Sequence, residues 1–364
     1  MLISEQYPES FHYTNIDGVE GIIKSNSIWA THYSFLNDIE EMLRLRKFLT
    51  KYCNEEIASL IKRLNIDEKK LAERFPSENH IVGMTRISVE NLHGAFLNKQ
   101  SAEPYVASFC SVAKEDEYVR NNGLLSQWRG YAEGGYALVF DTKKIEELVE
   151  SERYAIPGAL ALPSQPILKI GEVVYNEVDF VKKFTDEIKI LKERVCWMAE
   201  SSFVSPDKID KRLFNEGTIN KMSSSWMPAY MRCVTLYKDE GFKEEKEIRI
   251  AVFRIHDKYL KGLSTSKKEI KLRKEKGPYL ELFKRQEIKK VKTRYPSDYL
   301  GIKRIIVGPG VDKEARASKL REFLKKNKKN VEITISETPY INQANKFQKP
   351  TFISLFLKLF QGSN

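Results

Sequence analysis

The sequence has no run of apolar residues long enough to span a membrane. The longest nearly unbroken run, Phe352 to Phe360, is interrupted by Ser354 and Lys358, whereas a spanning helix needs about 20 predominantly apolar residues. Residues Met1 to Pro8 carry neither a basic nor an apolar stretch, so no secretory signal is expected there. We therefore expect a cytoplasmic protein without a transmembrane segment.

Cysteine and histidine are both scarce, and neither forms a recognisable metal site. Cys53, Cys110, Cys196 and Cys233 contain no C-x-x-C pair, and no histidine has another at i+3 or i+4. This spacing argues against structural zinc motifs and against a metal-dependent nuclease, and it predicts reduced, mostly buried thiols. We expect no bound metal.

Positive charge is concentrated in one segment. The 364 residues are 41% hydrophobic and carry a formal net charge of +11, a composition typical of a folded, soluble protein. Lys258 to Arg304 contains 16 basic and 5 acidic residues, while the remainder holds 45 of each sign. This segment is either a docking site for nucleic acid or an acidic partner, or a solvated loop and helix face.

Hydrophobic spacing predicts alternating strands and helices in the first third. Phe11 to Thr14 indicates a strand, Asn15 an N-cap, and the apolar residues from Ile16 to Ile23 a helix. Ile28 to Tyr33 is expected to be extended. Asn37, with Glu40 three residues later, resembles a capping box that opens a long helix through about Ile61.

The middle and end of the chain predict the centre of a sheet. We expect strands at Tyr105 to Cys110, Tyr136 to Phe140, Val234 to Tyr237, Glu245 to Phe253, Arg304 to Val307 and Val331 to Ile335, and a helix from Asp312 to Lys326. Gly308-Pro309-Gly310 lacks the spacing of a Rossmann loop, so it either cradles a phosphate or is only a turn. We predict one α+β domain over 1–337, with a helical insertion at 143–220 and a tail at 338–364.

Two segments far apart in the chain carry the candidate chemistry. His12 and Thr14 lie on the first strand, and Glu245, Glu247 and Arg249 alternate along a later one, so each group shares a strand face. If the two faces meet, they form a pocket that holds a dinucleotide. The alternative is a packed histidine and a solvated face of an amphipathic strand.

Several blocks resemble a known family. They are FHYTNIDGVEGIIKSNSIWATHYSFLND, YVASFCS, LLSQWRGYAEGGYALVFD, FKEEKEIRIAVF and IIVGPG, and together they are similar to the bacterial family called domain of unknown function 2971. The order of its elements is similar to that of ADP-ribosyltransferases, and its members often occur near phage-defence genes. The resemblance implies mixed, largely antiparallel sheets of ADP-ribosyltransferase-like type with helical insertions.

The resemblance also implies roles for individual residues around NAD. His12 would hold the nicotinamide ribose, Thr14 would support it or touch the nicotinamide amide, and Tyr33 or Tyr131 would stack on the nicotinamide. Glu247 would bond the ribose hydroxyls, and Glu245 would orient the acceptor. The NAD-binding set implied in this way is His12, Tyr13, Thr14, Tyr33, Ser108, Trp128, Arg129 and Tyr131, although Trp128 and Tyr131 alternatively serve as core aromatics.

The implied reaction breaks the bond between nicotinamide and ribose. Positive charge develops on the sugar, and a fixed carboxylate stabilises it. We thus expect an NAD-dependent ADP-ribosyltransferase-like effector or toxin of antiphage defence that modifies nucleic acid or protein, or an NAD glycohydrolase. The rival is a non-catalytic sensor module that binds nucleic acid or a partner through Lys258 to Arg304, and Phe352 to Phe360 is a candidate surface for a protein partner or self-association.

Overall fold

The computed structural model describes residues 2–36, 40–97, 102–132, 135–153, 168–203, 226, 228–255, 270–273, 277–284 and 300–340. The chain divides into two compact units: unit 1 comprises Met1–Asn26, Phe109–Ile145 and Tyr295–Asn364, and unit 2 comprises Ser27–Ser108 and Glu146–Arg294. Strand β3 (Ala102–Ser111) and helix α9 (Thr142–Arg153) contribute residues to both. The predicted cap Asn37, most of the basic segment and the apolar run Phe352 to Phe360 lie outside the described residues.

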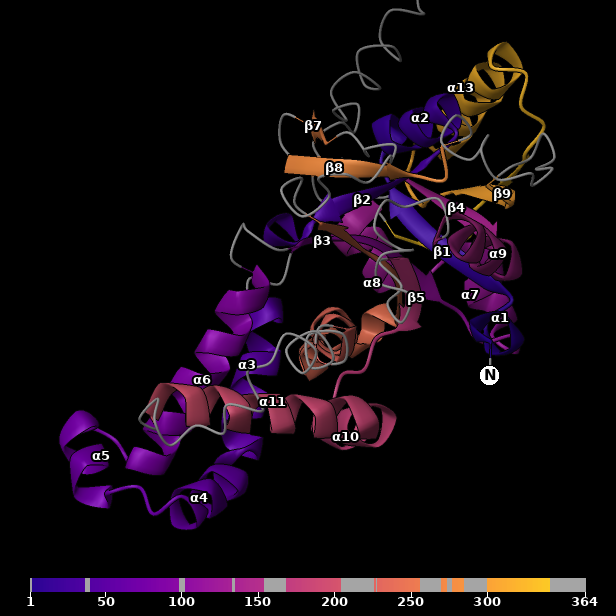
Figure 1. The fold of residues 1–364 in the computed structure, drawn as a ribbon. Coiled ribbons are helices and arrows are strands. Elements are labelled where there is room, and N and C mark those ends of the chain that lie inside the picture. The colour runs from indigo at the N-terminus through magenta and orange to yellow at the C-terminus, as the bar shows by residue number, and fades with distance from the viewer. Residues whose placement is uncertain are drawn as a thin grey trace, which may run out of the picture. The chain divides into compact units, whose positions relative to one another are not determined.

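The strands of unit 1 lie in the order β10-β9-β4-β1-β3, and Figure 1 labels β9, β4, β1 and β3. They are β1 (Glu9–Thr14), β4 (Tyr136–Asp141), β9 (Ile302–Val307), β10 (Glu332–Ile335) and the end of β3. Only β9 and β10 run parallel among these pairs. Because α13 (Lys313–Lys326) connects them, the predicted strand, turn, helix and strand near the end of the chain are confirmed.

Helices and one apolar cluster complete unit 1. The helices are α1 (Ile3–Gln6), α2 (Ile16–Ser25), α7 (Glu117–Asn122), α8 (Leu125–Gln127) and the π-helical turn η2 (Trp128–Ala132). The Asn15 side chain accepts a hydrogen bond from Gly18 N at 3.0 Å, which confirms the predicted cap of α2. Phe11, Tyr13 and Trp128 belong to one buried cluster on the β1 face that η2 covers.

The side chain of Arg316 holds the loop Gly308-Pro309-Gly310 through its carbonyl oxygens. The Arg316 guanidinium donates to the carbonyl oxygens of Gly135, Gly308 and Pro309 at 2.9, 2.9 and 3.1 Å. The positions available to a ligand at these carbonyls are therefore filled by a side chain of the same unit. A phosphate at this loop would bind backbone N–H groups at the helix N-terminus rather than these carbonyl oxygens, so the turn and the phosphate cradle both stay predictions.

The strands of unit 2 lie in the order β5-β6-β3-β2-β8-β7. They are β2 (Ile28–His32), β5 (Leu168–Glu172), β6 (Glu247–Ile255), β7 (Lys271–Arg273), β8 (Gly277–Leu282) and the first part of β3. The β2/β3, β2/β8, β5/β6 and β7/β8 pairs are antiparallel. The fold is thus mixed α and β with largely antiparallel strands, and the segment 143–220, predicted to be mostly helical, contains the strand β5 besides the helices described.

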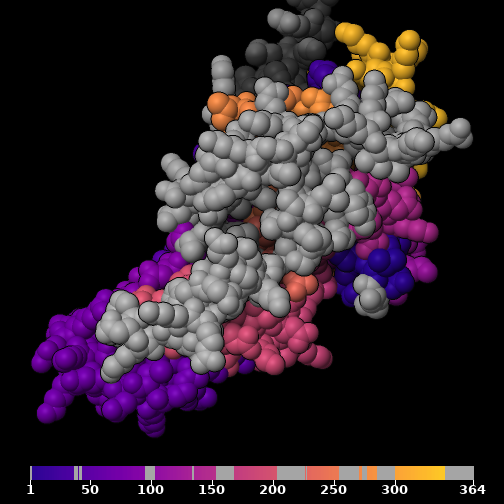
Figure 2. All heavy atoms as spheres, viewed as in Figure 1, coloured from indigo at the N-terminus to yellow at the C-terminus, as the bar shows by residue number. Residues whose placement is uncertain are grey.

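The helices of unit 2 contribute most of a second apolar core. They are η1 (Tyr33–Phe35), α3 (Glu41–Tyr52), α4 (Asn54–Arg63), α5 (Glu68–Arg74), α6 (His80–Leu97), α10 (Glu177–Lys183), α11 (Thr185–Phe203), a helix over 228–236 and η5 (Glu240–Glu245). Figure 1 shows α4 and α6 beside α11, and α3 packs on α4 and α6. Figure 2 shows part of these helices as a violet surface. The described helices include none that is both long and apolar enough to cross a membrane.

Two predicted elements of unit 2 are wrong. The long helix through Ile61 is broken at Cys53, which ends α3 and precedes α4. The strand predicted at Val234 to Tyr237 is the end of the helix over 228–236, and only Tyr237 forms a β-bridge, with Val174. The residues buried there, among them Tyr230, Cys233 and Val234, recur at helical spacing, so a four-residue window was too short to reveal the period.

Candidate functional site

Charged residues are buried on one face of β6. Ile248, Ile250 and Val252 fill the other face, and all are buried. Glu247 and Arg249 alternate with them and are only 6% and 2% exposed. The interpretation of a solvated strand face is therefore wrong, because both charges lie inside the protein.

Two cations converge on one oxygen of Glu247. Arg249 donates to Glu247 Oε2 through Nε at 3.0 Å and Nη2 at 2.7 Å, and Lys238 Nζ lies 3.2 Å from the same oxygen. Lys238 also donates to Glu245 Oε2 at 2.6 Å. We call Lys238, Glu245, Glu247 and Arg249 the Glu247 cluster; its formal charges cancel.

Backbone contacts from three segments hold this cluster in place. Val174 accepts from Lys238 N at 3.0 Å and donates to Leu236 O at 2.8 Å, which fixes the chain that carries Lys238. The Tyr175 hydroxyl accepts from Glu247 N at 2.7 Å. Arg249 Nη1 donates to Thr235 O at 3.0 Å, so the guanidinium also satisfies a carbonyl near the end of the helix over 228–236.

Burial dominates the acid-base behaviour of Glu247. Desolvation raises its pKa to about 7, and the negative charge of Glu245 acts in the same direction. Lys238 and a hydrogen bond with the Ser108 side chain lower it. Perturbed carboxyl groups of this kind are frequent in functional sites, although structural ion-pair networks produce them too.

The Glu245 side chain reaches the cluster from outside the strand. The sequence placed Glu245 and Glu247 on one strand face, but β6 begins at Glu247, and Glu245 is the last residue of η5. Lys246, between them, has a positive φ of 45°, which turns the chain. Lys238 rather than strand alternation therefore brings the two carboxylates together.

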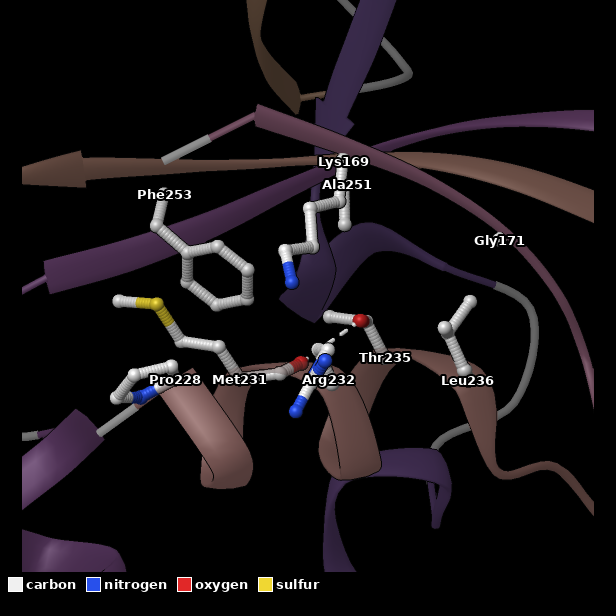
Figure 3. A pocket seen from close by; sticks show the side chains of 9 residues that line it. All are labelled: Lys169, Gly171, Pro228, Met231, Arg232, Thr235, Leu236, Ala251 and Phe253. Carbon is white, nitrogen blue, oxygen red and sulfur yellow. Dashed lines mark hydrogen bonds between the residues drawn. The ribbon is translucent and has the colours of Figure 1, made fainter. Parts of the chain in front are cut away.

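A small hollow lies between β6 and the helix over 228–236 (Figure 3), and no residue of the Glu247 cluster lines it. Its volume is about 10 Å³, which is enough for about one water molecule. Ala251 and Phe253 border it from β6, and Thr235 and Met231 from the helix over 228–236. Lys169 extends into it from β5 (Figure 3). This hollow does not accommodate a dinucleotide as it stands.

The residues predicted around NAD in unit 1 divide between the two faces of β1. His12 lies beside the Phe109 ring, with a centroid distance of 5.7 Å. Tyr13 points to the opposite face because strand side chains alternate, and it packs edge-on against Trp128 at 4.8 Å. Its hydroxyl accepts from Leu124 N at 2.7 Å, and burial raises the pKa of Tyr13.

The remaining members of the predicted set are also placed in unit 1 or unit 2. In unit 1, Thr14 is buried beside α2. Tyr131 packs against the buried apolar cluster that contains Tyr13 and Trp128. The exposed Arg129 lies 5.3 Å from the Tyr340 ring. In unit 2, Tyr33 packs beside His32 with a centroid distance of 4.6 Å. Ser108, also in unit 2, forms a hydrogen bond with Glu247; these two predicted residues therefore meet, although no pairing between them was predicted.

Sequence reasoning missed Lys238, Thr235 and Tyr175. Lys238 precedes Glu247 by nine residues and follows a helix, so no periodic pattern relates the two. Tyr175 comes from a segment about 70 residues earlier. A basic residue in an otherwise apolar stretch, Val234 to Lys238, was the available signal. Within the described part of the chain, no group of three or more histidine, cysteine, aspartate or glutamate side chains suits a metal ion.

Comparison with protein families adds one finding. A family model described as Protein of unknown function (DUF2971) matches residues 127–250. This match supports the resemblance of the chain to the DUF2971 family. Every member of the Glu247 cluster lies within the DUF2971 match, whereas Ser108 precedes it. No curated protein matches the chain, and no solved structure matches it either.

Proposed function

We propose that this chain is a non-catalytic binding module for nucleic acid, in which the Glu247 cluster stabilises the sheet of unit 2. The observation that carries the proposal is the closed state of the cluster. Lys238 and Arg249 both contact Glu247 Oε2, and the Glu247 side chain is buried. A carboxylate that serves two buried cations is a structural partner for them.

In this proposal, basic residues between Lys258 and Arg304 bind the nucleic acid. In the described part of the basic segment, cations outnumber the carboxylates they contact. Lys271 and Lys284 share Glu281 at 2.8 and 3.0 Å in unit 2, and Lys303 and Arg304 share Glu9 at 2.7 Å each in unit 1. Each carboxylate thus leaves positive charge uncompensated, which favours phosphate contacts.

Fluorescence anisotropy with labelled 20-nucleotide RNA and 20-base-pair DNA tests this function. We expect binding at 50 mM salt that weakens steeply by 200 mM, since phosphate contacts release counterions. Lys284→Gln should reduce the salt dependence by roughly 0.9 in the log-log slope for duplex DNA. Lys271 remains to pair with Glu281 in this variant, and Lys69→Gln, on an exposed face of α5, is the matched control. Absence of binding to both nucleic acids at 50 mM salt would refute the proposal.

A second candidate is the NAD-consuming reaction of ADP-ribosyltransferases or NAD glycohydrolases, in a phage-defence effector. It is favoured by the resemblance and by the raised pKa of Glu247, about 7. In this reading Glu247 stabilises the oxocarbenium-like sugar, Glu245 orients the acceptor, and His12 holds the ribose. Water as acceptor gives hydrolysis, whereas nucleic acid or protein gives transfer.

Release of nicotinamide from NAD separates the two candidates. The binding module releases none, with or without added nucleic acid. The enzyme releases nicotinamide, and Glu247→Gln stops the release while circular dichroism of the variant stays unchanged. Glu240→Gln, at an exposed position of η5, should retain full activity.

A further inference from the structure

A polar cavity in unit 1 contains no residue of the Glu247 cluster. Its volume is about 410 Å³, which falls in the usual range of small-molecule sites. Arg120 and Asn122 line it from α7, Arg304 from β9, and Thr334 from β10. Residues from three elements therefore converge on one space.

The positive charge of this cavity is held in place by Glu9. Arg304 donates to both oxygens of the Glu9 carboxylate, at 2.7 and 2.9 Å, and Arg120 Nε contacts it at 3.3 Å. Lys303 contributes a third cation at 2.7 Å. Three cations thus surround one carboxylate that is only 2% exposed. Glu9 neutralises one of these three positive charges, so the group as a whole remains positively charged.

Two donors of the cavity wall have no acceptor among the described residues. Arg120 uses Nε for Glu9 and Nη1 for the Lys114 carbonyl, which leaves Nη2. Asn122 is 6% exposed, and its Oδ1 accepts from Glu337 N at 2.6 Å. That hydrogen bond fixes the orientation of the amide and leaves the Nδ2 donors of Asn122 for a ligand.

The hydroxyl of Thr334 is a third unused group. Thr334 lines the cavity, yet its Oγ1 is buried without a hydrogen-bond partner. Rotation about χ1 exchanges the hydroxyl with the methyl group. A ligand oxygen would satisfy this hydroxyl, which otherwise costs free energy in the folded state.

The other charged side chains of the wall are acidic. Glu332 and Glu337 also line the cavity, and both are exposed. Their negative charges disfavour a ligand that is anionic throughout. Carboxylates accept hydrogen bonds from hydroxyl groups, so the wall combines donors for an anionic group with acceptors for neutral hydroxyls.

We propose that this cavity binds a phosphorylated sugar. Arg120, Asn122 and Thr334 donate to the phosphate oxygens, because a guanidinium suits phosphate geometry. Glu332 and Glu337 accept from the sugar hydroxyls. The site is formed by unit 1 alone; it shares Arg304 with the proposed nucleic-acid surface, but the ligand contacts assigned here come from other residues.

Isothermal titration with ribose 5-phosphate tests the assignment, with inorganic phosphate and ribose as separate probes. We expect ribose 5-phosphate to bind more tightly than either. Arg120→Gln should weaken binding on the order of tenfold or more, since it removes a charge-assisted hydrogen bond. Arg304 and Lys303 still pair with Glu9 in this variant. Arg321→Gln, an exposed arginine of α13, should bind like the parent.

Thr334→Val distinguishes ligand binding from a structural role. Valine has the same shape and removes a buried hydroxyl that has no partner, so the melting temperature should stay unchanged or rise. Binding of ribose 5-phosphate should nevertheless weaken several-fold. A variant that loses stability and retains the parent affinity overturns the role of Thr334.

Three other results would overturn the proposal as a whole. The parent protein fails to bind ribose 5-phosphate at millimolar concentration, or binds inorganic phosphate equally well, or Arg120→Gln binds as the parent does. Because thermal melting of each variant is measured without ligand, a folding defect is separated from a binding defect.

Discussion

Replacement of Glu9 by glutamine should destabilise unit 1 in a pH-dependent manner. The side chain keeps its shape and one carbonyl oxygen, but the negative charge that faces Arg120, Lys303 and Arg304 disappears. The cations then repel one another with no carboxylate between them. Since Arg304 is largely buried, with a side chain 12% exposed, water replaces the lost contact only in part.

The pKa of Glu9 gives the magnitude. Burial alone raises it, but hydrogen bonds and charges from Arg304 and Lys303 outweigh burial and hold it at about 2, against an ordinary 4.5. This difference corresponds to roughly 3 kcal/mol of unfolding free energy at pH 7. A depressed folded-state pKa stabilises the protein above the unfolded value, and the contribution falls as pH drops from about 4.5 towards about 2.

Urea unfolding followed by tryptophan fluorescence measures this effect. Trp128 is the one tryptophan of unit 1, so its emission reports on the unit that contains Glu9. The free-energy difference between parent and Glu9→Gln should be at least about 3 kcal/mol at pH 7 and roughly 2 kcal/mol of pairing energy at pH 3.5. Glu314→Gln, at an exposed position of α13, is the control. A difference below 1 kcal/mol, or one that does not change with pH, would refute the reasoning.

Three further substitutions test other contacts. Glu247→Leu should cost about 3–5 kcal/mol because Arg249 stays buried without an acceptor, and Glu247→Leu/Arg249→Met should regain most of it in urea unfolding; equal losses would contradict this. Arg316→Ala should cost about 2–3 kcal/mol, since three loop carbonyls lose their donor, and an unchanged melting temperature would argue against it. Gly18→Ala should destabilise by about 1–3 kcal/mol, although alanine favours helices, because its Cβ would lie 2.0 Å from Thr14 Oγ1. Gly18→Ala/Thr14→Ala should reverse that loss in thermal melting.

Local signals in the sequence predicted the regular elements well. Asn15 caps α2 as expected, because its side chain needs only the backbone of the next turn. The strands β1 and β4 and the unit from β9 to β10 follow the predicted apolar runs. Short apolar runs were the weak point. Val234 to Tyr237 was predicted to be a strand but is helical up to residue 236. The prediction failed because four apolar residues do not distinguish a helix from a buried strand.

The candidate site was predicted in part. Glu247 and Arg249 were singled out together, and the structure pairs them at 2.7 Å. Their burial was not predictable, because it depends on a helix over 228–236 that the sequence suggested as a strand. Lys238 was missed for the same reason. The Glu9 network was missed entirely, since its three cations lie between about 110 and 295 residues away along the chain.

The sequence by itself determined the alternation of charges on β6, the caps and turns, and the concentration of basic residues between Lys258 and Arg304. These features depend on neighbours within a few positions of the chain. Only the tertiary structure decided that Glu247 is ion-paired inside unit 2, and that Glu9 collects cations beside a cavity in unit 1. A charge becomes buried or exposed according to which distant segment packs on it, and local spacing contains no information about that segment.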